Sequence, residues 1–435
     1  MDRQRLSHYK WLLLAALFLF VWAAYLSTII GTSGDSRWSL PTALSIIKEF
    51  NTDLNEFAEI LDIEDKRIEC IDGRFRTIFP IGASILATPF VAGIDLTLTK
   101  FPFFEEFLRA RIPSIDEKVT IVNGYFGFEM LIASWFVALT TVVFFLIARN
   151  RLPLSSALLS TFVFAFCTSA WSVAATALWQ HGPSMLMLTL TLYLLIRGQS
   201  DNRMICLAGL PLAFSYVVRP TNAVSILFLS VFVVVHHRKQ APFYFLLAGV
   251  IMSAFFAYNL SIYGALLSPY YTPTRLGSNP AFWEALAGNL VSPARGLFVF
   301  SPILFFSIIG LILLFKNKAA TPLDYYLICI IVFHWLTVSS FHHWWGGKSF
   351  GPRFFCDMLP YLCYFLVRYL EFAPVLHRGH RLILHAGFLL CLAISFAIHL
   401  RGASSMAAWG WHETPLYLDH HPERVWDWRD LQFLR

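Results

Sequence analysis

Long apolar runs alternate with short polar segments along most of the chain. Eleven of these runs are candidate membrane spans, although several are shorter than the roughly 20 residues that a helix needs to cross a bilayer. They cover residues 11–30, 119–148, 154–175, 183–196, 204–218, 223–235, 242–263, 297–315, 323–340, 354–370 and 382–400. The pattern predicts an all-α protein, a polytopic transmembrane helical bundle of about 11 to 13 spans with short helices in its extracytoplasmic loops.

One further apolar run, residues 79–97, disturbs this alternation. It is long enough to span, but counting it as a full crossing would move every later loop to the other side of the membrane. We therefore expect it to re-enter the membrane or to pack within the bundle. The alternative is a full crossing, with the two runs around Arg219 merged into one hairpin.

Basic residues near the ends of the runs indicate the orientation. With eleven spans, all the basic clusters fall on one side, which the positive-inside rule makes cytoplasmic. The clusters are Arg3, Arg5 and Lys10; Arg149 and Arg151; Arg197 and Arg203; Arg238 and Lys239; Lys316 and Lys318; and Arg378 and Arg381. We therefore expect an integral protein of a bacterial inner membrane, with a cytoplasmic N-terminus, an uncleaved first helix and an extracytoplasmic functional face.

These assignments divide the chain into a bundle, residues 1–400, with a first outside loop at 31–78, and an outside tail, residues 401–435. Hydrophobic residues make up 57% of the chain and charged residues 14%, against about 25% charged in soluble domains, which excludes a soluble enzyme. The seven cysteines form neither a disulfide framework nor a CxxC metal motif, and no nucleotide-binding motif is present. We expect membrane lipids as partners, no nucleic acid and no cofactor.

The first outside loop carries Asp35 directly after the first span. A carboxylate at the mouth of a bundle is partly desolvated, which suits a general base. The alternative is that Asp35 caps an interfacial helix over residues 41–50. Further along, Asp53 is a candidate substrate contact and Arg74 a candidate partner of an anionic headgroup, unless both are solvated interfacial charges.

Arg219 precedes Pro220 at a break between two apolar runs. Proline removes a backbone donor and restricts the residue before it. An arginine at bilayer depth costs about 2.5 to 3.5 kcal/mol unless it faces water, a partner or an anion. We expect Arg219 to line a cavity and bind a lipid phosphate, whereas with full-length helices it would snorkel to the outer interface.

The outside loop of residues 341–353 is the richest in chemistry. Its indole rings suit a sugar face or a prenyl chain, and Lys348 with Arg353 suits a phosphate. We expect Asp357 to pair with Arg353, one turn away. The alternative is an interfacial aromatic belt with anchoring cations, and the histidine pair lacks the third spaced ligand of a zinc site. The candidate substrate contacts of this loop are His342, His343, Trp344 and Trp345.

Two other outside positions add candidate substrate contacts. Gln180 and His181 begin a span, where His181 could bind a substrate or accept a proton, although a lone interfacial histidine is usually satisfied by water or backbone. Tyr270 lies in a loop that also carries proline and arginine, on the face suited to an acceptor. No metal ligands are predicted.

In this order, the motifs resemble the multispan glycosyltransferases of the GT-C fold, the superfamily of protein O-mannosyltransferases and aminoarabinose transferases. The resemblance extends to about Pro360 and is carried by Gly34-Asp35, the loop with Asp53, Phe79-Pro80-Ile81-Gly82, Arg219-Pro220-Thr221, and Trp344-Trp345-Gly346-Gly347 through Gly351-Pro352-Arg353. It implies a polyprenyl-phosphate sugar as donor, inverting transfer, and an aspartate in the first outside loop as base, which by position is Asp35. Arg219, Lys348 and Arg353 would stabilise the leaving phosphate. The family's Pro-Pro pair is missing at Pro80, so neither the sugar nor the glycan, lipid or protein acceptor is predicted.

Two other functions stay open on these residues. A flippase or transporter of lipid-linked sugars could use the same cations and aromatic side chains without Asp35, although transporters usually show repeats and midplane charges. An enzyme like the O-antigen ligases or polymerases would depend on His181 or His343 more than on Asp35. An Asp35→Asn variant distinguishes these functions, because it should abolish sugar transfer by a glycosyltransferase of this kind and leave translocation by a flippase intact.

Overall fold

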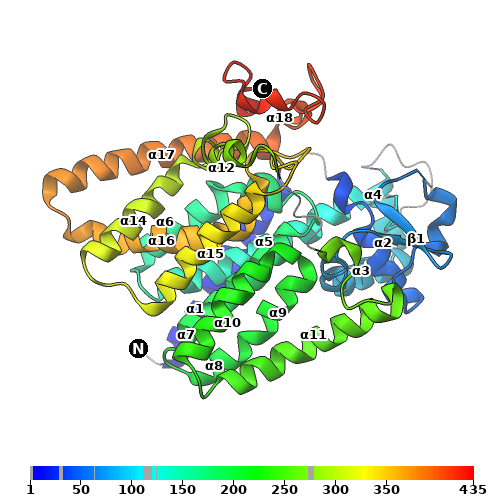
Figure 1. Ribbon diagram of the computed structural model, residues 1–435, viewed down its shortest axis with the longest axis horizontal. Helices are drawn as coiled ribbons and strands as arrows, with labels where there is room; N and C mark the ends of the chain where they lie inside the picture. Colours follow the sequence, from blue (N-terminus) through cyan, green and yellow to red (C-terminus); the bar gives the residue numbers. More distant parts are fainter. Residues whose placement is uncertain (1–2, 29–32, 63, 111–119, 124, 273–278) are drawn as a thin grey trace.

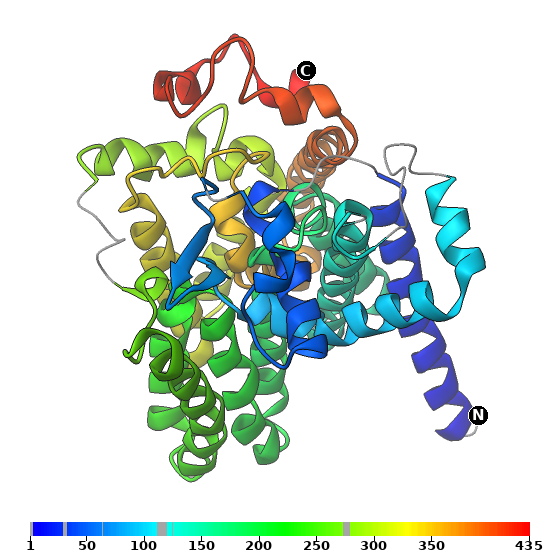
Figure 2. The same cartoon turned by 90° about the vertical axis from the view of Figure 1, so that its right-hand side faces the viewer.

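The computed structural model describes residues 3–28, 33–62, 64–110, 120–123, 125–272 and 279–435. Over these residues the chain is helical, apart from one antiparallel hairpin of β1 (Ile68–Ile71) and β2 (Arg74–Thr77). The long helices gather in one body, with the hairpin at one end and the C-terminal segment over the top (Figure 1). Figure 2 shows the N-terminus and the C-terminal segment at opposite ends of the molecule. The predicted all-α class is confirmed.

The long helices pack side by side, and shorter helices connect or cover them. The helices are α1 (Arg3–Leu26), α2 (Ser39–Lys48), α3 (Gly82–Lys100), α4 (Pro102–Arg109), α5 (Tyr125–Arg149), α6 (Leu154–Phe166), α7 (His181–Arg197), α8 (Asn202–Leu207), α9 (Gly209–Val218), α10 (Ala223–His236), α11 (Ala241–Tyr263), α12 (Phe282–Val291), α13 (Leu297–Phe300), α14 (Phe305–Lys316), α15 (Pro322–Ser339), α16 (Leu359–Phe372), α17 (Arg378–Ser404) and α18 (Met406–Gly410). Within the described residues, α3, most of α5, α11, α15 and α17 are long and apolar enough to cross a membrane. This fits a membrane protein, while the number of spans, about 11 to 13, stays a prediction.

The helices depart from the predicted runs where proline interrupts the backbone ladder. The run 297–315 forms two helices, α13 and α14, because Pro302 between them has no N–H to donate. The run 79–97 forms α3, one continuous helix that packs against α2 and α9. The break at Pro220, between α9 and α10, is where the sequence predicted it. This last break matters most for the site, because it brings Arg219 into the bundle.

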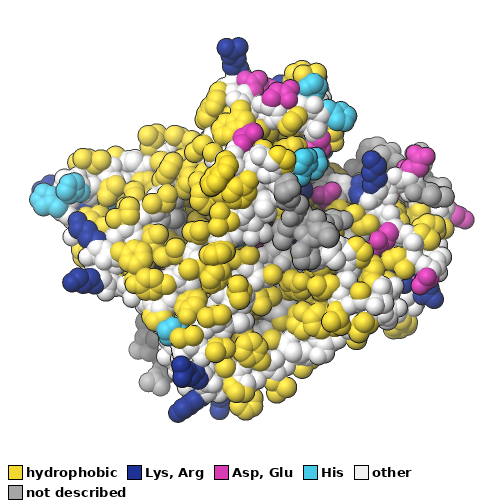
Figure 3. Space-filling view, in the orientation of Figure 1, with side chains coloured by type: hydrophobic (Ala, Val, Ile, Leu, Met, Phe, Trp, Pro, Cys, Tyr) yellow, Lys and Arg dark blue, Asp and Glu magenta, His cyan; other side chains and the backbone are white. Residues whose placement is uncertain are grey.

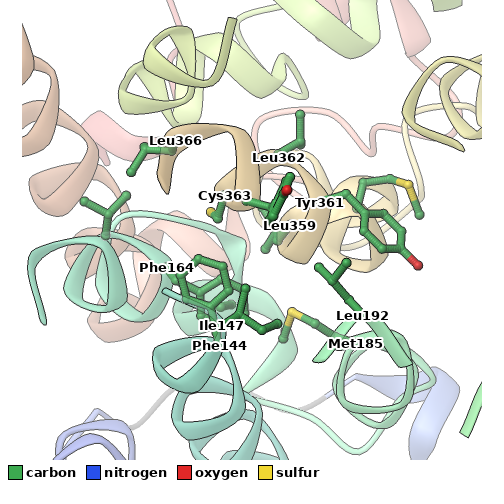
Figure 4. Packing of buried hydrophobic residues seen from close by; sticks show 14 of the residues in the cluster. Phe144, Ile147, Phe164, Met185, Leu192, Leu359, Tyr361, Leu362, Cys363 and Leu366 are labelled. Carbon is green, nitrogen blue, oxygen red and sulfur yellow. The ribbon is translucent and has the colours of Figure 1, made fainter. Parts of the chain in front are cut away.

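The core lies where α5, α6, α7 and α16 meet (Figure 4). The rings of Phe144 and Phe164 stack there, with centroids 4.7 Å apart and planes 13° from parallel. The outer helices instead expose large apolar side chains, such as Phe243 of α11 and Leu382 of α17. Figure 3 shows hydrophobic side chains over most of the visible face. A bilayer solvates such a surface directly, whereas water does not.

A close helix crossing joins α14 to α16 and depends on a glycine. A Cβ on Gly310 would lie 2.0 Å from the carbonyl oxygen of Phe365, so a larger residue cannot be fitted without moving a helix. A Cβ on Gly249 of α11, by contrast, meets nothing within 4 Å. The two glycines therefore form a matched pair for testing the packing of the bundle.

We expect Gly310→Leu to lower the thermal unfolding midpoint of the purified protein by about 3 °C or more, because overpacking forces α14 away from α16. Gly249→Leu is expected to leave the midpoint unchanged, since the added side chain points into open space. Differential scanning fluorimetry in detergent measures both. Equal midpoints for the two variants would contradict the close approach of α14 and α16.

Candidate functional site

A cavity of about 710 Å³ opens between the first loop, the start of α7, the α9–α10 break and the loop that follows α15. Its described lining is largely aromatic and apolar, and the aspartate and arginine side chains in it are Asp35, Arg219, Arg353 and Asp419. A concave, mostly apolar site with a few convergent charged groups is typical of a small-molecule or lipid-headgroup pocket. We therefore take this cavity as the candidate functional site.

Asp35 lies at the cavity in a short 3-10 turn, Gly34–Ser36. Its backbone N–H donates to Ser33 Oγ at 3.2 Å, and its Oδ2 accepts from a guanidinium N–H of Arg353 at 3.2 Å. The side chain is 42% exposed, so water also reaches the carboxylate. The alternative role as a helix cap is wrong, because α2 begins only at Ser39.

Arg353 lines the cavity between two aromatic rings. Its guanidinium carbon lies 5.1 Å from the ring centroid of Trp179 and 5.3 Å from that of Phe354. Gly346, with a φ of +73°, packs so close that a Cβ there would lie 3.0 Å from Arg353 Nε. This Nε is buried and has no hydrogen-bond partner in the described part of the chain. The guanidinium is thus held in place with one N–H unused.

Arg219 lines the cavity from the α9–α10 break and is only 6% exposed. Its Nε donates to Thr221 Oγ1 at 2.7 Å and lies 3.0 Å from Asp357 Oδ2, and another N–H donates to His181 Nδ1 at 2.9 Å. The ion pair is close in distance, but neither oxygen of Asp357 has an aligned hydrogen-bond partner among the described residues. Arg219 thus lines a cavity, as the sequence analysis expected, while binding of a lipid phosphate stays a prediction.

Asp357 pairs with Arg219 and not with Arg353, which corrects the prediction from sequence. That prediction assumed an α-helical turn, in which residues four apart face the same side. The segment Arg353–Met358 is instead a 3-10 helix, in which three residues complete a turn and the fourth points elsewhere. Arg353 is left to pair with Asp35, 318 positions away in the chain.

The remaining predicted contacts divide into two groups, and the first group also lines the cavity. It comprises Gln180, His181, Tyr270, His342 and His343. Gln180 Nε2 donates to Tyr270 Oη at 3.0 Å, which joins the start of α7 to the loop after α11. The rings of His342 and His343 meet edge to face at 5.0 Å and are exposed. Hydrogen-bonding groups from three separate segments therefore meet at one cavity.

Part of the 341–353 loop turns away from the cavity, which corrects the prediction for three of its residues. Lys348 pairs with Glu413 at 2.5 Å and does not belong to the cavity lining described here. Trp344 and Trp345 are buried against the C-terminal tail and lie outside that lining too. Their indole surfaces are therefore used for internal packing and are not open to a sugar.

Arg74 and Asp53 also lie outside the described lining of the cavity, beside the β-hairpin. Arg74 donates to Asp53 Oδ2 at 3.3 Å, and Arg76 lies 3.9 Å from the same oxygen. Asp53 is buried whereas Arg74 is exposed, so the carboxylate ties the hairpin to the first loop. Neither of the two predicted roles, substrate contact for Asp53 and phosphate binding for Arg74, has support in this geometry.

The C-terminal tail contributes Asp419, a cavity residue that no local sequence motif indicated. Its Oδ1 accepts from Trp345 Nε1 at 2.8 Å. The tail is anchored by Gln432, whose buried Oε1 accepts from Arg295 and from the backbone N–H of Gly351, both at 3.1 Å. Arg295 is buried and donates to two further carbonyl groups of the same loop. The tail therefore supports the loop that carries Arg353.

The cavity offers a carboxylate that can accept a proton, two guanidinium groups that can bind an anion, and aromatic faces. Among the residues that the structure describes, no three His, Cys, Asp or Glu side chains gather closely enough to hold a metal ion. No protein-family model matches this chain, and no curated protein matches it. We therefore infer the function from the chemistry of the cavity.

Burial of His412 in the C-terminal tail makes the stability of the folded protein depend on pH. The side chain is buried, and burial together with the positive charges of Arg295, Lys348 and Arg424 lowers its pKa from 6.5 to about 2. The folded protein thus keeps His412 neutral, whereas the unfolded chain takes up a proton below pH 6.5. The stability contributed by the neutral ring is fully present above pH 6.5 and decreases as the pH falls from 6.5 toward 2.

We expect the thermal unfolding midpoint to fall as the pH is lowered from about 7.5 to about 5, and His412→Asn to flatten this dependence. Uptake of one proton on unfolding changes the free energy of unfolding by at most about 1.4 kcal/mol per pH unit. The slopes of wild type and His412→Asn should therefore differ by no more than this amount. His420→Asn, an exposed tail position, serves as the control and should keep the wild-type slope. Identical slopes for wild type and His412→Asn would show that His412 is not buried as described.

Proposed function

We propose that this chain is a membrane-embedded glycosyltransferase with a GT-C-like bundle, which transfers a sugar from a polyprenyl-phosphate carrier to an extracytoplasmic acceptor. The observation that carries the proposal is the Asp35–Arg353 pair at a cavity that Arg219 also lines. Transfer from a lipid carrier requires a proton acceptor beside cations, in a bundle whose apolar walls admit a prenyl chain. This cavity combines these features from segments far apart in the sequence.

In the proposed reaction, Asp35 accepts the proton of the acceptor hydroxyl, and the hydroxyl oxygen attacks the anomeric carbon on the face opposite the phosphate. The bond from the anomeric carbon to the phosphate oxygen breaks, the configuration inverts, and the electron pair leaves on the polyprenyl phosphate. Arg353 and Arg219 stabilise the charge that builds on this phosphate. Gln180 and Tyr270, already hydrogen-bonded to one another, are positioned to bind sugar hydroxyls.

The distribution of charge supports an extracytoplasmic site. The left and lower left of Figure 3 carry Lys, Arg and His with hardly any Asp or Glu, and the N-terminus, α8 and the α14–α15 connection lie on that side in Figure 1. Acidic side chains gather at the top and right, over the C-terminal segment and the first loop. By the positive-inside rule we assign the basic side to the cytoplasm and the cavity to the outer face of a bacterial inner membrane.

We expect Asp35→Asn to slow transfer by at least about 100-fold, because the acceptor hydroxyl loses its proton acceptor. Lipids co-purified with wild type and variant are extracted and identified by mass spectrometry, which gives the mass of the bound prenyl phosphate and its sugar. The variant should carry the intact lipid-linked sugar, and the wild type the spent polyprenyl phosphate. Release of polyprenyl phosphate in membrane vesicles then gives the rate.

Asp72→Asn is the matched control, since Asp72 is exposed in the turn of the same loop and asparagine tolerates its φ of 51° equally well. This variant should release polyprenyl phosphate at the wild-type rate. Release of polyprenyl phosphate by Asp35→Asn at the wild-type rate would contradict the mechanism. Translocation of a lipid-linked sugar by both proteins, with no release by either, would instead identify a flippase.

A further inference from the structure

The two cavity arginines differ in how firmly their counter-ions are held. Arg219 pairs at 3.0 Å with Asp357, which is fully buried, whereas Arg353 pairs at 3.2 Å with Asp35, which is 42% exposed. Removing one partner from a buried pair leaves an uncompensated charge and is strongly unfavourable. A half-exposed carboxylate is rehydrated when it separates, so its ion pair is weak. Of the two carboxylates, Asp35 is the one that can leave.

The ring of Phe354 lies beside both arginines. The guanidinium carbons of Arg219 and Arg353 lie 5.7 Å and 5.3 Å from its centroid. The Nε of Arg353 is buried beside Gly346, so an anion would bind the terminal N–H that now donates to Asp35. An anion that replaces Asp35 therefore gains the guanidinium N–H that the carboxylate gives up, close to a second positive charge.

We propose that the anionic phosphate of the donor displaces Asp35 from Arg353, so that binding of the donor also releases the base. This inference rests on the proposed glycosyltransferase function and adds an order of events to it. Before the donor binds, an N–H of Arg353 occupies Asp35 Oδ2, so this oxygen is not free to accept a hydrogen bond from the acceptor hydroxyl. After the exchange, the phosphate holds Arg353 and the carboxylate is free for the acceptor hydroxyl. The acceptor is thus activated only when a donor is present.

If phosphate displaces Asp35 from Arg353, then removing the carboxylate of Asp35 should strengthen binding of polyprenyl phosphate, the spent carrier. Purified wild type and Asp35→Asn are titrated with undecaprenyl phosphate in detergent, and the affinity is measured by native mass spectrometry. Asp35→Asn should bind about three- to tenfold more tightly, because the carboxylate no longer competes for Arg353. Arg353→Gln should bind at least about tenfold more weakly, because the charged donor is lost. Asp72→Asn, the exposed control, should match the wild type.

A double-mutant cycle assigns the gain to the ion pair. The tighter binding of undecaprenyl phosphate by Asp35→Asn should disappear in an Arg353→Gln background. Without the guanidinium of Arg353, the carboxylate and the phosphate no longer compete for the same group. The tighter binding should persist in an Arg219→Gln/Asp357→Asn background, which removes both partners of the buried pair together and leaves Arg353 in place. A gain that persisted without Arg353 would reflect simple charge repulsion and would overturn the exchange.

The remaining outcomes separate this inference from the proposed function. Equal or weaker binding by Asp35→Asn would overturn the exchange but leave the glycosyltransferase proposal standing, whereas no binding of undecaprenyl phosphate by the wild type would overturn both. Inorganic phosphate, titrated in parallel, distinguishes a lipid phosphate from a free anion. It should bind at least about 100-fold more weakly because it lacks the prenyl chain. Equal affinity for the two would overturn the assignment to a lipid carrier.

Discussion

A guanidinium group inside an apolar bundle needs a counter-ion, and the pairing of Arg219 with Asp357 meets this need. An unpaired arginine at bilayer depth would cost about 2.5 to 3.5 kcal/mol or more. The break at Pro220 brings the arginine in, the 3-10 segment Arg353–Met358 supplies the carboxylate, and α7 supplies His181. Because Arg353 begins that 3-10 segment, the first ion pair also restricts where the second can form.

The loop after α15 depends on the tail as much as on its own sequence. Arg295 and Gln432 bind its backbone from two directions, and Trp344 and Trp345 pack beneath the tail. Gly346 then leaves just enough room for Arg353 between its aromatic neighbours. This wall of the cavity is therefore built from the C-terminal tail together with the loop after α15, and these contacts hold Arg353 in position.

The sequence was sufficient to predict a helical membrane protein. It also indicated those site residues that carry charge next to a helix break or at the start of a loop. Asp35, Arg219 and Arg353, proposed from such positions, line one cavity. The prediction from sequence was wrong where the partner of a side chain depends on the exact local backbone geometry or on a segment far away in the chain. The partner of Asp357 depends on a 3-10 and not an α-helical turn, and Lys348 is drawn away by Glu413 of the tail. Neither fact has a signature in the local residue pattern.

Two arginines meet three carboxylates at the cavity, since Asp357 pairs with Arg219, Asp35 pairs with Arg353, and Asp419 also lies in the described lining. A site with no surplus of positive charge exerts little long-range attraction on the phospholipid headgroups that surround it. Ordinary bilayer lipids far outnumber any prenyl carrier, and an uncompensated arginine would be occupied by them continuously. The lack of surplus positive charge among the described residues would thus reserve the cavity for a rare ligand that is bound through its shape as well as its charge.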